Sequence, residues 1–462
     1  MKRYDTIIIG TGQSGPSLAG ALTGKGQKVA IAEGYKIGGS CVNYGCIPSK
    51  TIRASARVAY LARRAADFGV NVGEVNVDMN AVIDRKARRV GDAHDGVENW
   101  LKNMDNLDLY EVYAQFEGTE NGVHRVRVGD EVIEAPRVYL NVGARPNIPP
   151  IEGLENVNYM TNEGILEQRT LPEHLLVLGG GYISLEMGQA FRRFGSEITI
   201  IEAAPSIIHR EDEDIRDSVR GILTDEGITV QEGKKAVKAE QADDGTITLT
   251  LEAKDGTTST VSGSHLMVAV GRIPNSDKLN LEAVGVETDK RGYITVDDHL
   301  QSNVPGIFVL GDANGRGAFT HTSYQDFEIA LDNFNGGNRK VSDRIMAYNL
   351  YTDPPLGRVG MSEQEARESG RNILMATKPM SHIGRALEQG ETQGLIKMLV
   401  DADTEQIVGA AVLGFQGDDV IQVISYFMYT GASYKVMQNA LPIHPTISEF
   451  FPTILGELKP LE

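Results

Sequence analysis

Residues 6–15 read Thr-Ile-Ile-Ile-Gly-Thr-Gly-Gln-Ser-Gly, and this stretch indicates how the first part of the 462-residue chain folds. Its β-branched run, Thr6–Ile9, is typical of a buried parallel strand. A helical stretch follows from Ser17 to about Lys25, and Gln27–Glu33 has the composition of a second strand that ends in an acid. Strand, glycine-rich turn, helix and strand together predict a Rossmann-like dinucleotide-binding unit.

The glycines and the acid of this unit are the residue types that a bound nucleotide requires. Gly10, Gly12 and Gly15 let the backbone approach a pyrophosphate at a helix N-terminus. Glu33 is placed to accept hydrogen bonds from a ribose. These four residues are therefore predicted to bind a cofactor.

A second stretch of the same kind begins at Leu175–Leu178. The glycine-rich turn Gly179–Ser184 follows, then a helix through Phe194, then the strand Glu197–Glu202. Two dinucleotide sites in one chain predict two nucleotides that exchange electrons, and a hydride donor with a flavin acceptor fits this best.

The second unit also predicts which hydride donor binds. Gly179 and Gly181 are expected to approach the pyrophosphate, and Ser184 is small enough to replace the third glycine. A carboxylate at Glu202 favours a ribose 2′-hydroxyl and repels a 2′-phosphate, so NADH is expected rather than NADPH. The basic pair His209–Arg210 lies just beyond and weakens that preference.

The two cysteines of the chain, Cys41 and Cys46, lie in the stretch Gly38–Lys50. A disulfide that closes so short a loop stabilises a fold by only about 2 kcal/mol, and a chain of this length can build its core without one. The pair follows soon after the first nucleotide-binding turn. We therefore interpret it as a redox-active pair beside a bound flavin.

Two helical regions follow the cysteines, Pro48–Phe68 and the more polar Val75–Leu101. The second carries a run of basic residues, for which an anion site is the alternative to a solvated helix face. Because the whole chain is acidic, we expect the solvated face. The basic residues are Arg85, Lys86, Arg88 and Arg89.

The remaining pattern divides into alternating and buried segments. Leu107–Leu140 and Ala236–Val261 alternate between apolar and polar residues, which predicts antiparallel strands. Gly306–Asp312 predicts a buried strand whose acid can bind a sugar-alcohol chain. His321 opens a predicted helix, where a structural role is expected of it. From about residue 341 antiparallel strands and one amphipathic helix are expected.

Composition excludes several classes of partner. With a net charge of −18, the chain repels phosphate backbones and anionic lipid surfaces, so neither nucleic acid nor membrane is an expected partner. No apolar run approaches the roughly 20 residues of a membrane span. The start of the chain is not typical of a signal peptide. We expect a cytoplasmic protein, and no metal site is predicted.

The motif Cys41-x4-Cys46-Ile-Pro-Ser-Lys50 and the stretch from His444 to Glu449 resemble the class I pyridine nucleotide–disulfide oxidoreductases. That family includes lipoamide dehydrogenase, glutathione reductase and mercuric reductase. The resemblance covers essentially the whole chain. It implies a homodimer with one FAD per subunit and an α/β fold of two Rossmann-like domains, for FAD and NAD, with a C-terminal α+β dimerisation domain.

The resemblance also implies roles at the redox pair. Cys46 would be the thiol that lies against the flavin, and Cys41 the interchange thiol that attacks the substrate. Lys50 would pair with Glu186 near the flavin. Tyr182 would cover the nicotinamide side of the flavin. The further cofactor-binding residues that it implies are Glu33, Ala114, Gly143, Gly271 and Asp312.

His444 would be the acid–base that acts on the partner subunit's cysteines, oriented by Glu449. The chemistry favours this pairing independently of the resemblance. A thiol with a pKa of about 8.5 is largely protonated at neutral pH, so a histidine is needed to take its proton. A carboxylate on the other ring nitrogen fixes the tautomer.

Some features depart from one branch of the family or another. Mercuric reductases carry a C-terminal cysteine pair, which this sequence lacks. Tyr44 replaces a small aliphatic residue between the cysteines, and Phe450–Phe451 is bulkier than in lipoamide-type enzymes; both are expected to change the substrate pocket. Ile207–Asp212 and Gly384–Leu387 look more like the metal-reductase branch.

The expected activity is transfer of electrons from NADH through FAD to the Cys41–Cys46 disulfide and on to a small disulfide, or the dihydrolipoyl-type reaction in reverse. The alternative is a reductase for mercuric, cupric or a similar soft metal ion. A redox sensor without turnover is a third reading, which the intact set of cysteines, base and acid disfavours. Four segments are expected. Residues 1–150 form the first part of the FAD-binding domain, and residues 151–275 form the NAD(P)H-binding domain. Residues 276–340 complete the FAD site, and residues 341–462 form the dimerisation domain at the interface.

Overall fold

The computed structural model describes residues 1–461. Its first sheet is wholly parallel, and its central strands β2, β3 and β8 are buried on both faces, as is typical of parallel sheets. The strand order is β19-β8-β2-β3-β4. These strands are β2 (Thr6–Ile9), β3 (Val29–Ala32), β4 (Leu107–Tyr110), β8 (Val138–Leu140) and β19 (Ile307–Val309).

Thus β19, far along the chain, pairs with β8 and completes a sheet that begins at residue 6. Two helices pack together on this sheet, α1 (Ser14–Thr23) and α8 (Thr320–Phe334). Their apolar residues join one core with β2 and β3. The helix α8 therefore starts beside the first glycine-rich turn.

Part of the strand prediction for Leu107–Leu140 was wrong. Its middle is the expected antiparallel meander, β5 (Ala114–Glu120), β6 (Val123–Val128) and β7 (Glu131–Ala135), with β1 (Lys2–Arg3) parallel to β7. Its two ends, however, are β4 and β8 of the parallel sheet. All three residues of β8 are buried, so burial on both faces explains the difference.

The second sheet is also parallel, in the order β10-β17-β11-β12-β13. It carries a three-stranded antiparallel sheet beside it, as the alternation in Ala236–Val261 predicted. The parallel strands are β10 (Tyr159–Met160), β11 (His174–Leu178), β12 (Glu197–Ile201), β13 (Thr229–Gln231) and β17 (His265–Val268). The antiparallel strands are β14 (Lys234–Gln241), β15 (Ile247–Ala253) and β16 (Thr258–Gly263).

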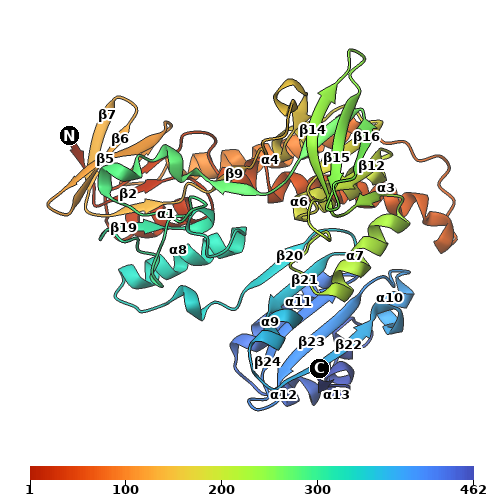
Figure 1. Cartoon of the computed structure of the whole chain (residues 1–462). Coiled ribbons are helices and arrows are strands. Elements are labelled where there is room, and N and C mark those ends of the chain that lie inside the picture. The colour runs from red at the N-terminus through yellow and green to blue at the C-terminus, as the bar shows by residue number, and fades with distance from the viewer. Residues whose placement is uncertain (462) are drawn as a thin grey trace.

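A two-stranded antiparallel ribbon connects the two Rossmann-like parts. It pairs β9 (Ala144–Pro146) with β18 (Arg272–Pro274), the segments that leave and return to the first part. Figure 1 shows β9 running between the first sheet and the second.

The last sheet has six antiparallel strands in the order β20-β21-β24-β23-β22-β25. Helix α11 (Gly417–Tyr429) packs on β21 and β24, as its amphipathic sequence predicted. The strands are β20 (Ala347–Leu350), β21 (Leu356–Gly360), β22 (Ile373–Pro379), β23 (Leu395–Asp401), β24 (Ile407–Leu413) and β25 (Lys459–Pro460). The predicted α/β architecture with a C-terminal α+β unit is confirmed.

The other helices connect or cover these sheets. The longer α-helices are α3 (Cys46–Arg63), α4 (Met79–Lys102), α6 (Tyr182–Phe194) and α7 (Glu213–Asp225). The shorter ones are α2 (Gly39–Asn43), α5 (Asn162–Ile165), α9 (Glu363–Glu368), α10 (Gly384–Glu388), α12 (Tyr434–Gln438) and α13 (Phe451–Gly456). The 3₁₀ turns are η1 (Ala65–Phe68), η2 (Leu154–Asn156), η3 (Asn275–Lys278), η4 (Leu281–Val284), η5 (Gly311–Asn314), η6 (Val341–Asp343), η7 (Met380–His382) and η8 (Ser448–Phe450).

A buried ion network attaches the second unit to the last sheet. Arg358 on β21 pairs with Asp212 at 2.9 Å and with Glu211 at 3.4 Å. Lys397 on β23 contacts Asp214 at 2.7 Å and Asp212 at 3.3 Å. Because removal of one partner of such a group leaves a buried charge unpaired, the network fixes how these two parts dock.

Helix α4 differs from the solvated face that its basic run predicted. Lys86 is only 2% exposed and pairs with Glu167, so the prediction was wrong for this residue. Arg85, Arg88 and Arg89 are exposed, as expected. Among the helices of residues 1–461, none is both long enough and apolar enough to span a bilayer.

Candidate active site

The two cysteines lie on consecutive helices next to the first glycine-rich turn. Cys41 is in α2, and Cys46 is the first residue of α3. Gly39, at φ +63°, lets this segment pack against the turn, since a Cβ atom there would lie 2.8 Å from Gly12 Cα. Both cysteines are free thiols and half-buried.

The surroundings of the two thiols differ, and so do their pKa values. The hydrogen bond from Cys41 lowers the pKa of Cys46 to about 6, with further help from Thr320 and from the charge of Lys50, although burial opposes the shift. The same hydrogen bond, together with burial, raises the pKa of Cys41. Cys46 is therefore the thiolate of the pair at neutral pH, and Cys41 carries the proton.

Thr320 was not predicted from the sequence. It is the first residue of α8, and its Oγ1 lies 3.0 Å from Cys46 Sγ. A hydroxyl that donates to a thiolate stabilises the charge, and so do the N-terminal ends of α3 and α8. Only the tertiary fold brings Thr320 to this place.

Lys50 and Glu186 are brought together, as predicted. Lys50 Nζ lies 2.8 Å from Glu186 Oε2, which links α3 to the helix of the second nucleotide-binding unit. Glu186 also accepts a hydrogen bond from the Tyr351 amide at 3.0 Å. The Lys50 ammonium lies 4.3 Å from the centre of the Tyr351 ring, a cation–π distance.

Tyr182, at the start of α6, is held by a group that sequence reasoning missed. Its hydroxyl donates to Glu211 at 2.8 Å, and Tyr348 donates to the same carboxylate at 2.9 Å. The rings of Tyr182 and Tyr348 are 5.9 Å apart, and Phe319 stacks on Tyr348 at 5.3 Å. The side chain of Glu211 is fully buried. Its only sequence signal was its place within Ile207–Asp212.

The two strand-end acids bind their own glycine-rich turns in the same way. Glu33 accepts hydrogen bonds from the Thr11 amide at 2.9 Å and the Thr11 hydroxyl at 2.7 Å. Glu202 accepts from the amides of Gly180 and Ala204. These hydrogen bonds therefore fix each carboxylate at the end of its strand.

A side-chain nitrogen of Asn141, unpaired within residues 1–461, indicates that the Gly10–Gly15 turn can hold a dinucleotide. Asn141 has a buried side-chain nitrogen with no partner within the described residues. A Cβ atom on Gly12 or Gly15 would lie 3.1 or 3.2 Å from it, so it is directed at this turn. An unsatisfied buried donor is costly, and a ligand rich in acceptor oxygens would satisfy it.

The other predicted cofactor residues border open space or the same sheet. Asp312 lies in η5 after β19, and burial raises its pKa while Arg272, 3.7 Å away, lowers it. A Cβ atom on Gly143, Gly181 or Gly271 would meet nothing within 4 Å, which leaves room for a ligand there. Ala114 is buried at the start of β5. Gly10 and Gly179 have φ values of +105° and +103°, which only glycine adopts readily.

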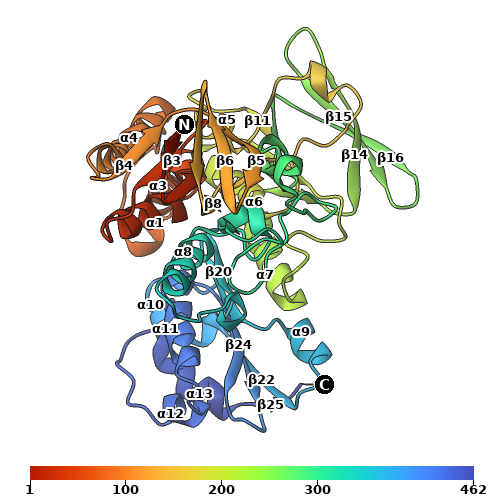
Figure 2. The same ribbon diagram turned by 90° about the vertical axis from the view of Figure 1, so that its left-hand side faces the viewer.

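His444 and Glu449 form the predicted pair, but not beside the cysteines of their own chain. His444 Nδ1 lies 2.9 Å from Glu449 Oε2, and the imidazole is 79% exposed. This loop lies between α12 and α13, at the end of the last sheet that is far from α3 in both views (Figures 1 and 2). Large apolar side chains are exposed in this loop and on helices α11 and α12: Val423, Tyr426, Tyr429, Val436, Leu441 and Ile443.

A cavity of about 620 Å³ opens beside the redox pair. One wall is the face of α3 that carries Cys46 and Lys50, and the other is the face of α4 that carries Arg85 and Arg89. Tyr44 does not line this cavity, and its ring stacks on that of Tyr35 at 5.5 Å. The full lining is Cys46, Ile47, Lys50, Thr51, Arg85, Arg89, Asp92 and Ala93.

Two family models match the chain. Residues 4–326 match "Pyridine nucleotide-disulphide oxidoreductase", and residues 346–454 match the dimerisation domain of the same family. The chain belongs to the pyridine nucleotide–disulfide oxidoreductases, and it is a flavin-dependent enzyme that uses FAD and a pyridine nucleotide. The predicted family is confirmed.

Its similar relatives span several branches. The chain is 32% identical to the probable pyridine nucleotide-disulfide oxidoreductase RclA of Escherichia coli, over 99% of this chain and all of that protein. It is 31% identical to a mercuric reductase of Lysinibacillus sphaericus, over 96% of this chain and 81% of the relative. A dihydrolipoyl dehydrogenase of Cupriavidus necator is also 31% identical, over 97% and 96%.

Solved structures of RclA have the same fold. The structure described as an HOCl-induced flavoprotein disulfide reductase superposes with a TM-score of 0.88 at 31% identity, and the match covers 99% of this chain and 100% of the other. A Cu(II) complex of the same protein also gives 0.88. The predicted fold class is confirmed over nearly the whole chain.

Proposed function

We propose that this enzyme uses NADH to reduce a small disulfide through the Cys41–Cys46 pair. The observation that carries the proposal is the difference in pKa between the two thiols. Cys46 has the lowered pKa and Cys41 the raised one, and an acid–base pair, His444 with Glu449, is intact. A disulfide exchange reaction needs a thiolate, an attacking thiol and a base.

FAD, when bound, would accept a hydride from the nicotinamide and pass two electrons to the cysteine pair. Its pyrophosphate would lie at the Gly10–Gly15 turn, where Asn141 offers its free donor. Glu33 would bind the adenosine ribose, and Asp312 the ribityl chain. Lys50, fixed by Glu186, would place a positive charge beside the reacting atoms.

The disulfide step balances with the groups present. Cys41 gives its proton to His444 of the partner subunit and attacks one sulfur of the substrate, whose S–S bond breaks. The departing thiolate takes that proton back. The Cys46 thiolate then attacks Cys41 Sγ, restores the internal disulfide and releases the second product as a thiolate, which takes up the one proton that the overall reaction draws from solvent. Overall, NADH, one proton and RSSR give NAD⁺ and two RSH.

A homodimer is part of this proposal. The chain carries the family's dimerisation domain, and the loop of the exposed His444 imidazole also holds exposed apolar side chains such as Leu441, 95% exposed. In one chain the acid–base pair lies far from α3 (Figure 2). A second copy that covers this surface would bring His444 to the cysteines of its partner.

The preference for NADH rests on Glu202. Its side chain is fixed by the amides of Gly180 and Ala204, so a carboxylate occupies the place where a 2′-phosphate would lie. Comparison of kcat/KM for NADH and NADPH tests this point. An enzyme that uses NADPH at least as well would contradict it.

The function is tested by anaerobic reduction of the purified flavoprotein with NADH. We expect two newly alkylatable thiols per chain, Cys41 and Cys46, by mass spectrometry, and NADH oxidation with small disulfides. Cys46→Ser should stop disulfide turnover while NADH-dependent reduction of ferricyanide persists. If NADH exposes no thiol, or if Cys46→Ser still reduces disulfides, the proposal is wrong.

A metal-ion reductase is the second candidate. Two observations favour it: mercuric reductases are among the relatives, and RclA was solved as a Cu(II) complex. Two adjacent thiols are also the soft ligands that such ions prefer. If Hg²⁺ or Cu²⁺ sustains NADH oxidation and no disulfide does, this candidate replaces the first.

A further inference from the structure

We propose that the disulfide substrate is anionic and that Arg85 and Arg89 bind its negative groups. This inference rests on the proposed function and names the substrate class of that site. It depends on the cavity between α3 and α4, where two guanidinium groups share one space with Cys46, one of the two thiols of the redox pair.

The two helices place these groups by their regular spacing. Cys46 and Lys50 are four residues apart on α3, and Arg85 and Arg89 are four apart on α4, so each pair lies on one helix face. Cys46 forms a hydrogen bond with Cys41, so a disulfide in the cavity lies next to the pair. The volume of about 620 Å³ is within the range of roughly 300–1,000 Å³ of small-molecule sites.

The charges of the cavity do not cancel. Lys50 is neutralised by Glu186 at 2.8 Å. Arg85 donates a hydrogen bond to the Thr51 carbonyl at 2.8 Å, but its guanidinium group has no acidic partner among the residues that the structure describes. Arg89 has Asp92 at 3.8 Å, a distant and exposed pair. The cavity is therefore positive in a chain whose net charge is −18, which favours an anion.

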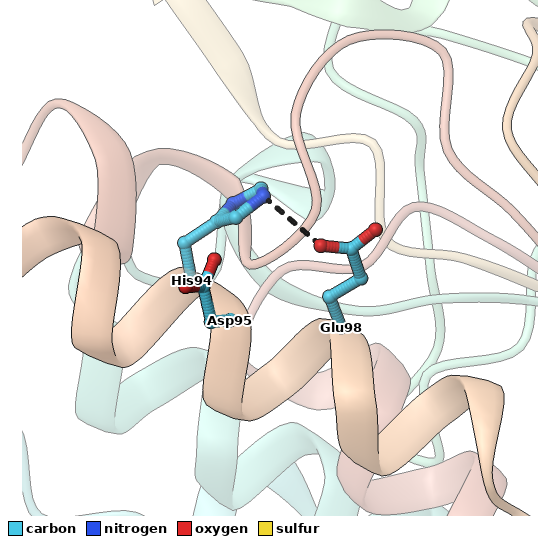
Figure 3. Close-up of side chains that lie close together, drawn as sticks. All are labelled: His94, Asp95 and Glu98. Atoms are coloured by element: carbon cyan, nitrogen blue, oxygen red, sulfur yellow. Dashed lines mark ion pairs between the residues drawn. The ribbon is translucent and has the colours of Figure 1, made fainter.

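Helix α4 is firmly attached, so these arginines are presented by a fixed surface. His94 Nδ1 lies 3.0 Å from the Ile37 carbonyl, just before the cysteine segment. Figure 3 shows His94 and Glu98 directed toward one another from successive turns of α4, and their ion pair spans 3.6 Å. On the same helix, buried Lys86 pairs with Glu167. These contacts anchor α4 over the segment that carries Cys41 and Cys46.

The class of substrate follows from the chemistry of the guanidinium group. Arginine binds carboxylates with two parallel hydrogen bonds, and it stays charged at every relevant pH. A small disulfide that carries carboxylates can bind one of them at Arg85 and Arg89 while its sulfur atoms reach the cysteine pair. The reaction is the one given above, with two carboxylate thiols as products.

Three disulfides of similar size test the inference with the flavoprotein and NADH. They are 3,3′-dithiodipropionate, which is anionic, bis(2-hydroxyethyl) disulfide, which is neutral, and cystamine, which is cationic. We expect kcat/KM to fall in that order, and the advantage of the anion to shrink as salt is added. Suberate has the shape of the first probe without its sulfurs, so we expect it to inhibit competitively.

Variants locate the charge. In Arg89→Gln, the ratio of kcat/KM for the anionic over the neutral disulfide should fall about fivefold to tenfold, the effect of one lost charge at contact distance. Asp92→Asn should change the same ratio in the opposite direction. Arg88→Gln is the matched control, because Arg88 is exposed on the same helix but does not line the cavity. Its ratio should stay unchanged.

The outcomes separate this inference from the proposed function. If the three disulfides are reduced equally well, or if Arg88→Gln lowers the ratio as much as Arg89→Gln, the function stands and the inference is wrong. If suberate inhibits Arg89→Gln as strongly as the parent enzyme, the inference is also wrong. If no disulfide is reduced, the proposed function itself fails.

Discussion

Replacing Thr320 by valine should raise the pKa of the Cys46 thiol without changing the shape of the site. The hydroxyl of Thr320 lies 3.0 Å from Cys46 Sγ, and valine replaces it with a methyl group. A hydrogen bond to a charged group contributes about 1.5–3 kcal/mol, and one pKa unit corresponds to about 1.4 kcal/mol. We therefore expect an upward shift of about one to two units.

That shift changes how much thiolate is present at neutral pH. The pKa of Cys46 starts at about 6, so about nine-tenths of this thiol is ionised at pH 7 in the parent enzyme. In Thr320→Val the fraction should fall to between roughly one-half and one-tenth. In the proposed reaction the Cys46 thiolate closes the internal disulfide, so turnover of disulfides at pH 7 should fall by a similar factor and recover as the pH rises.

The assay is the rate of alkylation of the NADH-reduced protein by iodoacetamide as a function of pH. Mass spectrometry of the two cysteine peptides separates Cys46 from Cys41, and Cys41 should react only at higher pH because its pKa is raised. Thr320→Ser keeps a hydroxyl and serves as the control. If the pKa of Cys46 in Thr320→Val stays within about 0.3 unit of the parent value, the hydroxyl does not stabilise the thiolate.

Three further changes probe other parts of the structure. His444→Gln removes the proposed base, whose Nδ1 lies 2.9 Å from Glu449, so we expect disulfide turnover to fall by about 10²–10⁴-fold and ferricyanide reduction to continue; full disulfide turnover would exclude this base. Leu441→Asp places a charge in the exposed apolar surface and should shift the enzyme from dimer to monomer by light scattering, whereas an unchanged mass would place the interface elsewhere. Asp353→Asn leaves buried Arg193 short of a partner and should lower the free energy of unfolding by about 3–5 kcal/mol, measured by urea unfolding. Burial alone would raise the pKa of Asp353, but Arg193 and Arg57 hold it below its usual value. The ionised Asp353 therefore stabilises the fold above its unfolded-state pKa, and this stabilisation is lost as the pH falls through the folded-state pKa. The free energy of unfolding of Asp353→Asn should lack this part of the dependence on acid pH.

Local sequence predicted the parts of this enzyme that depend on short-range geometry. A strand, a glycine-rich turn, a helix and a strand-end acid form one compact unit, so Gly10–Gly15 and Gly179–Ser184 could be located with their acids, Glu33 and Glu202. The same holds for Cys41 and Cys46, because their spacing alone brings them together. The pairing of His444 with Glu449 is likewise a local contact across one turn.

The residues that the sequence did not reveal are those that arrive from distant elements. Thr320 is 274 residues from Cys46, and nothing in its neighbourhood marks it as a thiol partner. Lys86 lies in a run of basic residues that predicts a solvated face, yet Glu167 and the packing of α4 bury it. Helical periodicity places Arg85 and Arg89 on one face of α4, but it does not say that α3 lies opposite.

The positions of these groups in one chain indicate that the two parts of the proposed reaction, electron transfer from NADH and disulfide exchange, can be separated. Lys50, Glu186 and Cys46 are assembled within a single chain, from α3 and α6. His444 and Glu449 lie in the segment between α12 and α13, far from α3 (Figure 1), so in the proposed reaction they act on the cysteines of another copy. A monomer should therefore accept electrons from NADH and pass them to ferricyanide, but it should exchange disulfides slowly. Dissociation would then separate two activities that share one pair of thiols, and a monomer that reduces disulfides at the full rate would show that the base lies within the chain.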